Sequence, residues 1–457
     1  MVTQSVSESV LKRVKDEKIN LIKFQWLGND LIPRAMVSHA EFLREHMRDG
    51  IGIPKALQSF NVLDKVAYEG SWGSEAPELK IMPDPETYSP VLYAPGSARM
   101  ISELWGPDLK PHATDARYFL RRMIAKANDM GYSPMVACET EFYVLRQGEG
   151  GAVTPYINTK FATSHSYDLY NDYVQEVFSN LATMGVHLER LKKEYGHSQI
   201  EPTLRYTGAL AAADSFVALK DVAKAIAAKR GLFASFMPKP YGGVPGSGCH
   251  IHLSLFDMKS KRNVFYDPDD GRGCKMSKLG YGFIGGVLRH MNGICIFGAP
   301  ISNSYKRLLP GSWAPAHVCY GYDHRGVALR IPSDSPHSDG SGQRIEWRVP
   351  DPSCNSYYAV GTLLAAGLDG IEKNIDPGDP VREDPARFSS QELERRGIAW
   401  LPRTVGEAIA EAKKDLFVKG TLGEMAFEEY IKVRESEWRD YREQVTPWEV
   451  ENYLTTL

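Results

Sequence analysis

The stretch "GSGCHIHLSLF", residues 246–256, places polar side chains at every second position after a turn of small residues. On a β-strand, His250, His252 and Ser254 point to one face of the sheet, and the apolar residues between them point to the other. An antiparallel strand often carries a solvated polar face, so a purely structural role is the simplest interpretation of any single strand of this kind. Histidines set beside a Gly-Ser-Gly turn are less typical of such a face, and they raise the question of what lies next to them.

Three further stretches carry charged residues at a related spacing: "CETEF" (138–142), "KKEYGHSQIEP" (192–202) and "RIEWRV" (344–349). Their charged residues of interest are Glu139, Glu141, Glu194, Glu201, Arg344, Glu346 and Arg348. Carboxylates on one face repel each other unless a cation lies between them. Carboxylates with an imidazole favour hard divalent cations such as Mg2+ or Mn2+. Arginines beside such a site suit phosphate and carboxylate groups, so the pattern predicts a metal-dependent site that handles phosphate.

The other common nucleotide-binding and hydrolytic motifs are absent from the sequence. No Gly-Lys dipeptide occurs, which excludes a P-loop, and "GGVPGSGCH" (242–250) does not fit G-x-G-x-x-G. No H-E-x-x-H motif occurs either, and no Ser-His-Asp arrangement is favoured. The phosphate-handling site therefore belongs to none of these classes.

The overall composition is that of an ordinary globular protein, and it narrows the class of partner. The net charge is −3, and no basic run with interleaved aromatic residues occurs, so no nucleic-acid partner is expected. No run of about 18 apolar residues and no signal peptide are present, so neither a membrane partner nor secretion is expected. Six cysteines without a C-x-x-C pair indicate free thiols in the cytoplasm.

The length of 457 residues predicts two domains, which we place at 1–110 and 111–457. The first is a small β-rich unit with a helix over 2–18 and strands over 19–27 and 78–83. The second is a large α+β unit. It begins with a helix over 116–131 capped by Asp115, continues with a strand over 134–145 and helices near 167–185 and 214–231, and becomes mainly helical after residue 355.

Several motifs resemble those of glutamine synthetase and its γ-glutamyl–amine ligase relatives, in the family's order. They are "FMPKP" (236–240), "GSGCHIHLSL" (246–255), "NSYKRLLPG" (303–311), "RIEWRVPDP" (344–352) and "VTPWEVENYL" (445–454). The resemblance implies a β-grasp-like N-terminal domain and a catalytic domain whose antiparallel sheet forms a funnel flanked by helices. It also implies a double-ring homo-oligomer, a decamer or dodecamer, with active sites shared between subunits. ATP would phosphorylate the γ-carboxylate of glutamate, and an amine would then displace phosphate.

The resemblance also implies a role for each site residue. The first metal ion would be held by Glu141, Glu194 and Glu201, and the second by Glu139, His250 and Glu346, with two or more Mg2+ or Mn2+ ions per site. The residues implied at ATP are His252, Ser254, Arg325, Arg330 and Arg344. Arg307, Arg348 and Gly246 match the glutamate site. Arg307 and Arg325 match catalytic positions, because arginines and metal ions neutralise charge that develops during phosphoryl transfer.

The sequence departs from the ammonia-using members of the family at the amine site. Their flap motif P-G-Y-E-A-P is represented here by residues 310–315, with Trp313 at the position of the glutamate. Their F-T-D motif is represented by residues 24–26, with Trp26 at the position of the aspartate, and F-D-G-S-S is represented by residues 68–72, "YEGSW". We expect that the loss of both carboxylates removes the partners of ammonium, and that the two indoles supply an apolar surface instead.

Three interpretations of the tryptophans remain open. The rings pack structurally and ammonia is still the substrate; they form a cation–π cage for an alkylammonium or polyamine; or they stack on a flat, weakly basic arylamine. We favour a bulky, apolar or aromatic amine over ammonia. A non-catalytic regulator is disfavoured because every implied metal ligand and arginine is present.

Two further departures concern the acid substrate and regulation. The asparagine of N-G-S-G-M-H is replaced by Pro245, which leaves the acid substrate open, although Arg307 and Arg348 favour a dicarboxylate such as glutamate. No tyrosine occurs from residue 359 to 429, where the bacterial adenylylation tyrosine would lie, so adenylylation is not expected.

Overall fold

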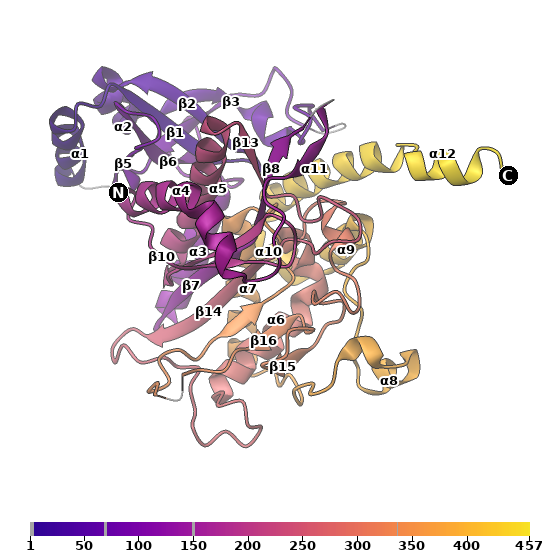
Figure 1. Ribbon diagram of the computed structural model, residues 1–457. Coiled ribbons are helices and arrows are strands. Elements are labelled where there is room, and N and C mark those ends of the chain that lie inside the picture. The colour runs from indigo at the N-terminus through magenta and orange to yellow at the C-terminus, as the bar shows by residue number, and fades with distance from the viewer. Residues whose placement is uncertain (1–3, 68–70, 149–150, 336) are drawn as a thin grey trace.

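The first β-sheet is built entirely from the N-terminal part of the chain. The structure is a computed structural model, and it describes residues 4–67, 71–148, 151–335 and 337–457. The sheet has the strand order β2-β1-β6-β4-β3, with β5 beside β6, and β1 and β6 run parallel whereas the other pairs are antiparallel (Figure 1). Its strands are β1 (Leu21–Leu27), β2 (Pro33–His39), β3 (Ile51–Pro54), β4 (Glu78–Pro83), β5 (Ser89–Pro90) and β6 (Ser97–Trp105). The predicted strands over 19–27 and 78–83 are confirmed.

Alternation along β1 divides that strand between two environments. Ile22, Phe24 and Trp26 are buried in a core that also includes residues of helices α1 (Gln4–Asp16) and α2 (Leu43–Asp49). The intervening Lys23 and Gln25 point the other way and both contact Asp221 of the second unit, at 3.0 and 2.6 Å. The period-2 pattern of the strand thus places one face on its own core and the other on the rest of the molecule.

The second sheet carries the polar strands that the sequence singles out. Its order is β13-β8-β11-β7-β14-β17-β16-β15, with β9, β10 and β12 attached at the side, and only β15 and β16 are parallel. The strands are β7 (Tyr132–Thr140), β8 (Phe142–Gln147), β9 (Val153–Pro155), β10 (Leu188–Lys193), β11 (Gln199–Leu204), β12 (Thr207–Gly208), β13 (Leu232–Ser235), β14 (Cys249–Asp257), β15 (Tyr320–Tyr322), β16 (Leu329–Ile331) and β17 (Ile345–Trp347).

The single strand predicted over 134–145 is in fact two strands that meet at Glu141. Strand β7 pairs with β14 as far as Thr140, and β8 then pairs with β11 and β13. The N–H of Glu141 donates to the carbonyl oxygen of Gly248 at 2.9 Å, so the break lies directly beside the Gly-Ser-Gly turn. A change of partner strand, which local propensity does not report, therefore positions this carboxylate.

Helices pack around the second sheet and around each other. They are α3 (Ala116–Asp129), α4 (Ser164–Thr183), α5 (Ala209–Lys229), α6 (Lys278–Gly298) and α7 (Ser356–Glu372). The Asp115 side chain accepts from the Tyr118 N–H, as the cap prediction requires, and the predicted helices near 167–185 and 214–231 are confirmed as α4 and α5. Helices α6 and α7 approach so closely that a Cβ at Gly286 would lie 2.1 Å from the Ala366 carbonyl oxygen.

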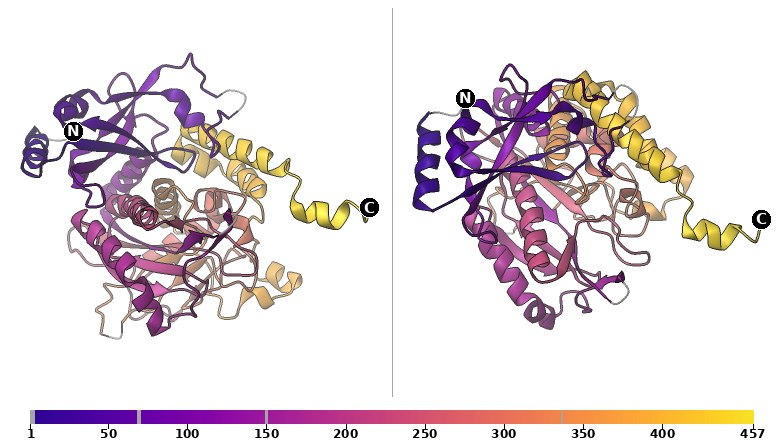
Figure 2. Two further views of the ribbon diagram at one scale, coloured as in Figure 1. Left: turned by 45° about the horizontal axis from the view of Figure 1, so that its top comes forward. Right: turned by 90° about the horizontal axis from the view of Figure 1, so that it is seen from above.

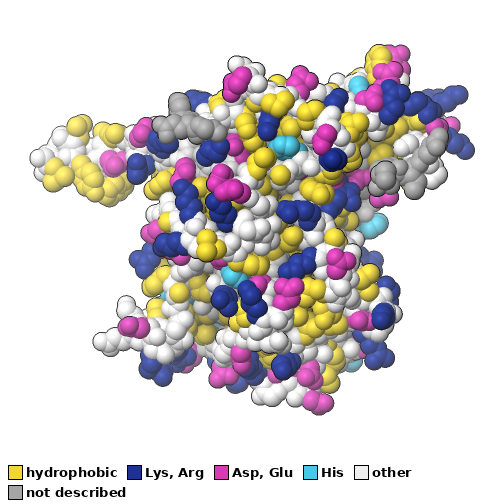
Figure 3. All heavy atoms as spheres, turned by 180° about the vertical axis from the view of Figure 1, so that it is seen from behind, with side chains coloured by type: hydrophobic (Ala, Val, Ile, Leu, Met, Phe, Trp, Pro, Cys, Tyr) yellow, Lys and Arg dark blue, Asp and Glu magenta, His cyan; other side chains and the backbone are white. Residues whose placement is uncertain are grey.

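The C-terminal helices tie the two units together and end in a projecting arm. They are α8 (Ser390–Arg395), α9 (Val405–Lys414), α10 (Leu416–Leu422), α11 (Glu424–Arg442) and α12 (Pro447–Tyr453). From α11, Arg434 donates to the Asn29 carbonyl oxygen at 2.5 Å, and Glu429 accepts from Ser59. Helix α12 extends away from the body (Figures 1 and 2), and hydrophobic side chains line it when it is viewed from behind (Figure 3). The domain boundary at residue 110 stays a prediction.

None of the helices in the described ranges combines the length and the apolar character needed to cross a bilayer.

Candidate active site

A row of polar side chains crosses four adjacent strands of the second sheet. The register places Glu139 of β7 opposite His250 of β14. It also places Glu346 of β17 opposite His252 on one side and Arg330 of β16 on the other. Antiparallel pairing of strands distant in the sequence therefore assembles the residues that the period-2 pattern predicts on one face.

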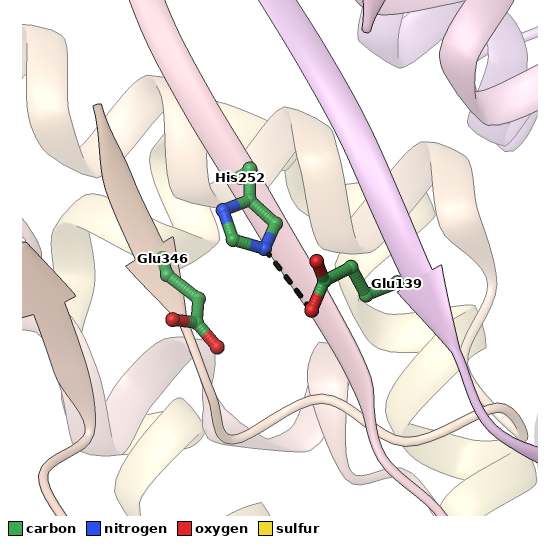
Figure 4. Close-up of side chains that lie close together, drawn as sticks. All are labelled: Glu139, His252 and Glu346. Atoms are coloured by element: carbon green, nitrogen blue, oxygen red, sulfur yellow. Dashed lines mark ion pairs between the residues drawn. The ribbon is translucent and has the colours of Figure 1, made fainter. Parts of the chain in front are cut away.

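Glu139, His252 and Glu346 direct their polar ends into one small space (Figure 4). Their candidate ligand atoms lie within 4.8 Å of one another, which is close enough for one metal ion. Nε2 of His252 lies 3.5 Å from Oε2 of Glu139. Burial opposes ionisation of Glu139, but the neighbouring His252, Lys192 and Arg190 together outweigh it and lower the pKa of this carboxyl group. The Glu139 carboxyl group is therefore ionised, the form that a metal ion requires of a carboxylate ligand.

The second ring nitrogen of His252, Nδ1, already accepts a hydrogen bond. Nε of Arg344 donates to Nδ1 of His252 at 3.2 Å, so Nδ1 is the acceptor and a neutral ring carries its proton on Nε2. Nε2 has no hydrogen-bond partner within the part of the chain that the structure describes. In this arrangement His252 can donate to an anion, such as a phosphate oxygen, at the position of Nε2.

Glu346 is held ionised by the basic groups around it. Arg348 Nη1 contacts Oε1, Arg330 Nη1 contacts Oε2 at 2.7 Å, and His250 Nδ1 lies 3.5 Å from Oε1. Burial disfavours the charged form, but Arg348 is the largest of the influences that overcome it and lower the pKa of Glu346 to about 2. Burial, with Arg348 next, keeps the pKa of His250 well below its ordinary value, so this imidazole is neutral and can act as a ligand.

A second group of carboxylates lies at the other side of β7. Lys192 Nζ binds both Glu194 and Glu201, at 2.7 and 2.8 Å. Burial, followed by the charge of Glu194, raises the pKa of Glu141 to about 7. Burial, followed by the charge of Glu141, raises the pKa of Glu201 to about 8. One ammonium group is therefore not enough to neutralise the three carboxylates.

Arg307 lies buried beside this cluster and is fixed by backbone oxygens. Its Nη1 donates to the Val349 carbonyl oxygen at 2.9 Å and its Nη2 to the Arg348 carbonyl oxygen at 3.0 Å. A Cβ at Gly246 would come within 2.9 Å of Arg307 Cγ, so a glycine at this position leaves room for the arginine side chain. Gly246 and the backbone of Arg348, the other two residues predicted for the glutamate site, are thus in direct proximity to Arg307.

The backbone of two loops is tied to Arg348. Its Nε donates to the Arg325 carbonyl oxygen at 2.9 Å and its Nη2 to the Trp313 carbonyl oxygen at 3.3 Å. Trp313 has a φ of +62°, uncommon for a residue with a side chain, and its side chain is 68% exposed. The loop therefore presents the indole to solvent while its backbone is anchored in the site.

Trp26 does not accompany Trp313, and this corrects the expectation that both rings line one amine site. It is 5% exposed and belongs to the core of the first sheet with Phe24 and Ile22, because residues of even number on β1 face that core. The ring of Trp26 packs structurally, as the first of the three interpretations expects of both tryptophans, whereas Trp313 is exposed. Residues 68–70 of the "YEGSW" motif lie outside the described residues.

Two site residues were missed by sequence reasoning. Gln199 donates through Nε2 to Glu141 Oε2 at 2.9 Å and to the Gly246 carbonyl oxygen at 3.0 Å. It precedes Glu201 by two positions on β11, so the period-2 rule could have found it. Lys192 lies opposite Glu201 in the β10–β11 register, which is not visible in the sequence. Of the predicted residues, Ser254 lies further along β14, opposite Met135.

The family model for "Glutamine synthetase, catalytic domain" matches residues 113–453. The chain belongs to the glutamine synthetase family. A glutamine synthetase of Methanosarcina mazei is 36% identical over 458 residues, with 99% of this chain and 98% of the relative covered. A glutamine synthetase of Thermotoga maritima is 36% identical, with 98% and 99% covered.

Two solved structures agree with this fold. A GmaS in complex with ADP superimposes with a TM-score of 0.86 at 26% identity, over 97% of this chain and 99% of that chain. A "novel glutamine synthase homolog" gives a TM-score of 0.82 at 27% identity, over 93% and 96%. The α+β fold expected from the sequence, with a sheet in the N-terminal part, is confirmed.

Membership makes the protein a carbon–nitrogen ligase of the glutamine synthetase family. Members of the family use ATP, a divalent metal, glutamate and ammonia or an amine. The residues present fit a divalent metal: burial, followed by the charge of a neighbouring carboxylate, raises the pKa of both Glu141 and Glu201, and the neighbouring His250 is kept neutral.

Proposed function

We propose that the protein is an ATP-dependent ligase that joins the γ-carboxylate of glutamate to a bulky, apolar or aromatic amine through γ-glutamyl phosphate. The observation that carries the proposal is Trp313. This loop position corresponds to the flap glutamate of the ammonia-using members, and here it presents an exposed indole whose backbone is bound to Arg348. An indole offers flat apolar surface and no negative charge, which suits an organic amine better than ammonium.

We assign the metal ligands in two groups. Glu141, Glu194 and Glu201 would hold one Mg2+ or Mn2+ ion, with Lys192 displaced, and Glu139, His250 and Glu346 would hold another. When bound, these ions supply positive charge for the phosphates of ATP and for the transferred phosphoryl group. The proton on His252 Nε2 supports placing this residue at a phosphate oxygen of ATP.

The arginines have distinct proposed tasks. Arg325, Arg330 and Arg344, together with Ser254, lie on the ATP side and contact phosphate, and Arg325 stabilises the transferred group. Arg307 and Arg348 bind the carboxylates of glutamate. Because Gly246 has no side chain, its own backbone can approach the bound glutamate. Arg307 is rigidly held by two carbonyl oxygens, so it is preorganised for a carboxylate.

The proposed function also implies a domain division, an oligomeric state and a cellular location. We propose two domains divided near residue 110, a double-ring homo-oligomer of ten or twelve subunits, and a cytoplasmic location. All six cysteines are free and buried, which suits a reducing compartment.

An ordinary ammonia-using glutamine synthetase is the second candidate. It is favoured by the relatives of 36% identity, whose printed name is glutamine synthetase. The deciding experiment measures phosphate release with ATP, glutamate and Mg2+ across a panel of ammonia, alkylamines, polyamines and arylamines. We expect the highest kcat/KM with an apolar or aromatic amine. Ammonia as the best acceptor would establish the second candidate instead.

The raised pKa values of Glu141 and Glu201 predict a pH-dependent affinity for metal. Both carboxyl groups are substantially protonated near pH 7, and a divalent cation requires the carboxylate form, so binding releases protons. The affinity for Mg2+ should therefore rise from pH 6 to pH 8. Titration calorimetry in two buffers of different ionisation enthalpy measures the released protons. Proton release should vanish in the double variant Glu141→Gln/Glu201→Gln, and binding without release in the native protein would contradict the assignment.

A further inference from the structure

A pocket outside the metal cluster lies beside the loop that carries Trp313. Its volume is about 360 Å³, within the range of small-molecule sites. Its walls include Trp313, His317, Asp323, His324, Arg325 and Asp384. None of the proposed metal ligands lines it, and apart from Trp313 and Arg325 its walls are residues that have no assigned role in the ligase reaction.

The pocket adjoins the proposed glutamate site through Arg348. Trp313 and Arg325 belong to separate segments of the chain, and the carbonyl oxygen of each accepts from the Arg348 guanidinium. Two lining residues of the pocket are thus bound directly by the side chain that we assign to a carboxylate of glutamate. This is the position expected for the second reactant of an amide-forming ligase.

The two carboxylates of the pocket, Asp323 and Asp384, differ in whether a cationic side chain of the protein already binds them. Asp323 is already paired with Arg330 at 2.9 Å and accepts from the Ser333 N–H at 2.8 Å. Asp384 accepts from the Ala386 N–H at 3.1 Å, and no lysine or arginine in the described ranges forms an ion pair with it. Asp384 is therefore a carboxylate that can receive a cation from outside the protein.

His317 supplies a second unmet polar group in the same pocket. It is 2% exposed, its ring lies 4.1 Å from that of Trp400, and its Nε2 has no hydrogen-bond partner among the described residues. A buried polar atom without a partner costs free energy that a ligand can recover. The pocket therefore offers the flat apolar surface of the Trp313 indole, the negative charge of Asp384 and the hydrogen-bonding nitrogen of His317.

We propose that this pocket is the acceptor site and that its ligand is a primary ammonium on a short aromatic body, of the benzylamine class. The ring lies against Trp313 and the ammonium group lies at Asp384 and His317. The inference rests on the proposed ligase function and narrows it, because a neutral arylamine such as aniline would leave Asp384 without a cationic partner.

The test compares benzylamine with aniline, since both have one aromatic ring but only benzylamine is protonated at pH 7. Titration calorimetry uses the full-length protein with glutamate, Mg2+ and a non-hydrolysable ATP analogue. Asp384→Asn, which keeps the capping oxygen for Ala386, should weaken benzylamine binding about tenfold and leave aniline binding unchanged. Trp313→Ala should weaken the binding of both amines. Leu309→Ala, at an exposed neighbour that does not line the pocket, should change neither.

The possible outcomes distinguish failure of the pocket assignment from failure of the proposed ligase function. If γ-glutamyl transfer occurs but Asp384→Asn leaves the ratio of benzylamine to aniline affinities unchanged, the pocket assignment is overturned and the ligase function stands. Absence of benzylamine binding to the native protein also overturns it. If benzylamine binds through Asp384 and no amine supports phosphate release, the pocket stands and the proposed reaction fails.

Discussion

Replacing Glu346 by glutamine should lower kcat for phosphate release about 1000-fold. The carboxylate is buried, lies opposite both His252 and Arg330 in the sheet, and binds Arg348 and Arg330 directly. Glutamine keeps the size of the side chain but removes the charge that orients both arginines and, in the proposed site, attracts a metal ion. The measurement is steady-state phosphate release at saturating ATP, glutamate and amine, with Mg2+ varied.

A matched control separates chemistry from folding. Glu372→Gln removes an exposed carboxylate from α7 whose one ion pair within the described ranges is with half-buried Lys126, and it should leave kcat within about twofold of the native value. Circular dichroism must show that Glu346→Gln is folded at the assay temperature, because unpaired buried arginines destabilise a protein. A folded Glu346→Gln protein with kcat within tenfold of native would remove Glu346 from the proposed catalytic machinery.

Replacing Trp313 by glutamate should shift acceptor preference toward ammonia. The change removes the exposed indole and returns a carboxylate to a loop whose backbone is bound to Arg348. We expect the ratio of kcat/KM for ammonia to kcat/KM for benzylamine to rise about 100-fold, the effect of losing an aromatic contact and gaining a cation partner. Kinetics with both acceptors, under saturating ATP and glutamate, measure this ratio.

Trp313→Gln is the informative companion, because it removes the ring without adding charge. It should weaken the use of benzylamine without improving the use of ammonia. If Trp313→Glu and Trp313→Gln give the same acceptor profile as the native enzyme, the ring does not contact the amine. Trp26→Asp is not a useful partner for this experiment, since it places a carboxylate in the core of the first sheet and should chiefly destabilise the fold.

The outcome for the two tryptophans shows what a sequence pattern can and cannot determine. Alternation correctly placed His250 and His252 on one face of β14, and Glu346 between two arginines, because the side-chain period of a strand is local. The same rule applied to β1 would have put Trp26 with Ile22 and Phe24 on the apolar face. The match to the motif of ammonia-using relatives instead suggested that Trp26 lines a ligand site. The structure agrees with the alternation along the strand, because Trp26 is buried in the core of the first sheet.

Features that depend on strand pairing were not visible in the sequence. Lys192 meets Glu194 and Glu201 only because β10 and β11 pair in one register. Glu141 leaves the strand because β7 and β8 have different partners. The pocket with His317 and Asp384 combines segments almost 70 positions apart in the sequence, and neither residue belongs to any motif. Long-range register, rather than local propensity, decides these contacts.

The most direct test of the account is a competition in a single reaction. The native protein is incubated with ATP, Mg2+, glutamate and equal concentrations of ammonia and benzylamine, and the products are separated and identified by mass spectrometry. The account predicts γ-glutamylbenzylamide in excess over glutamine, with one phosphate released per amide formed. Glutamine as the dominant product would show that the indole of Trp313 does not select the acceptor.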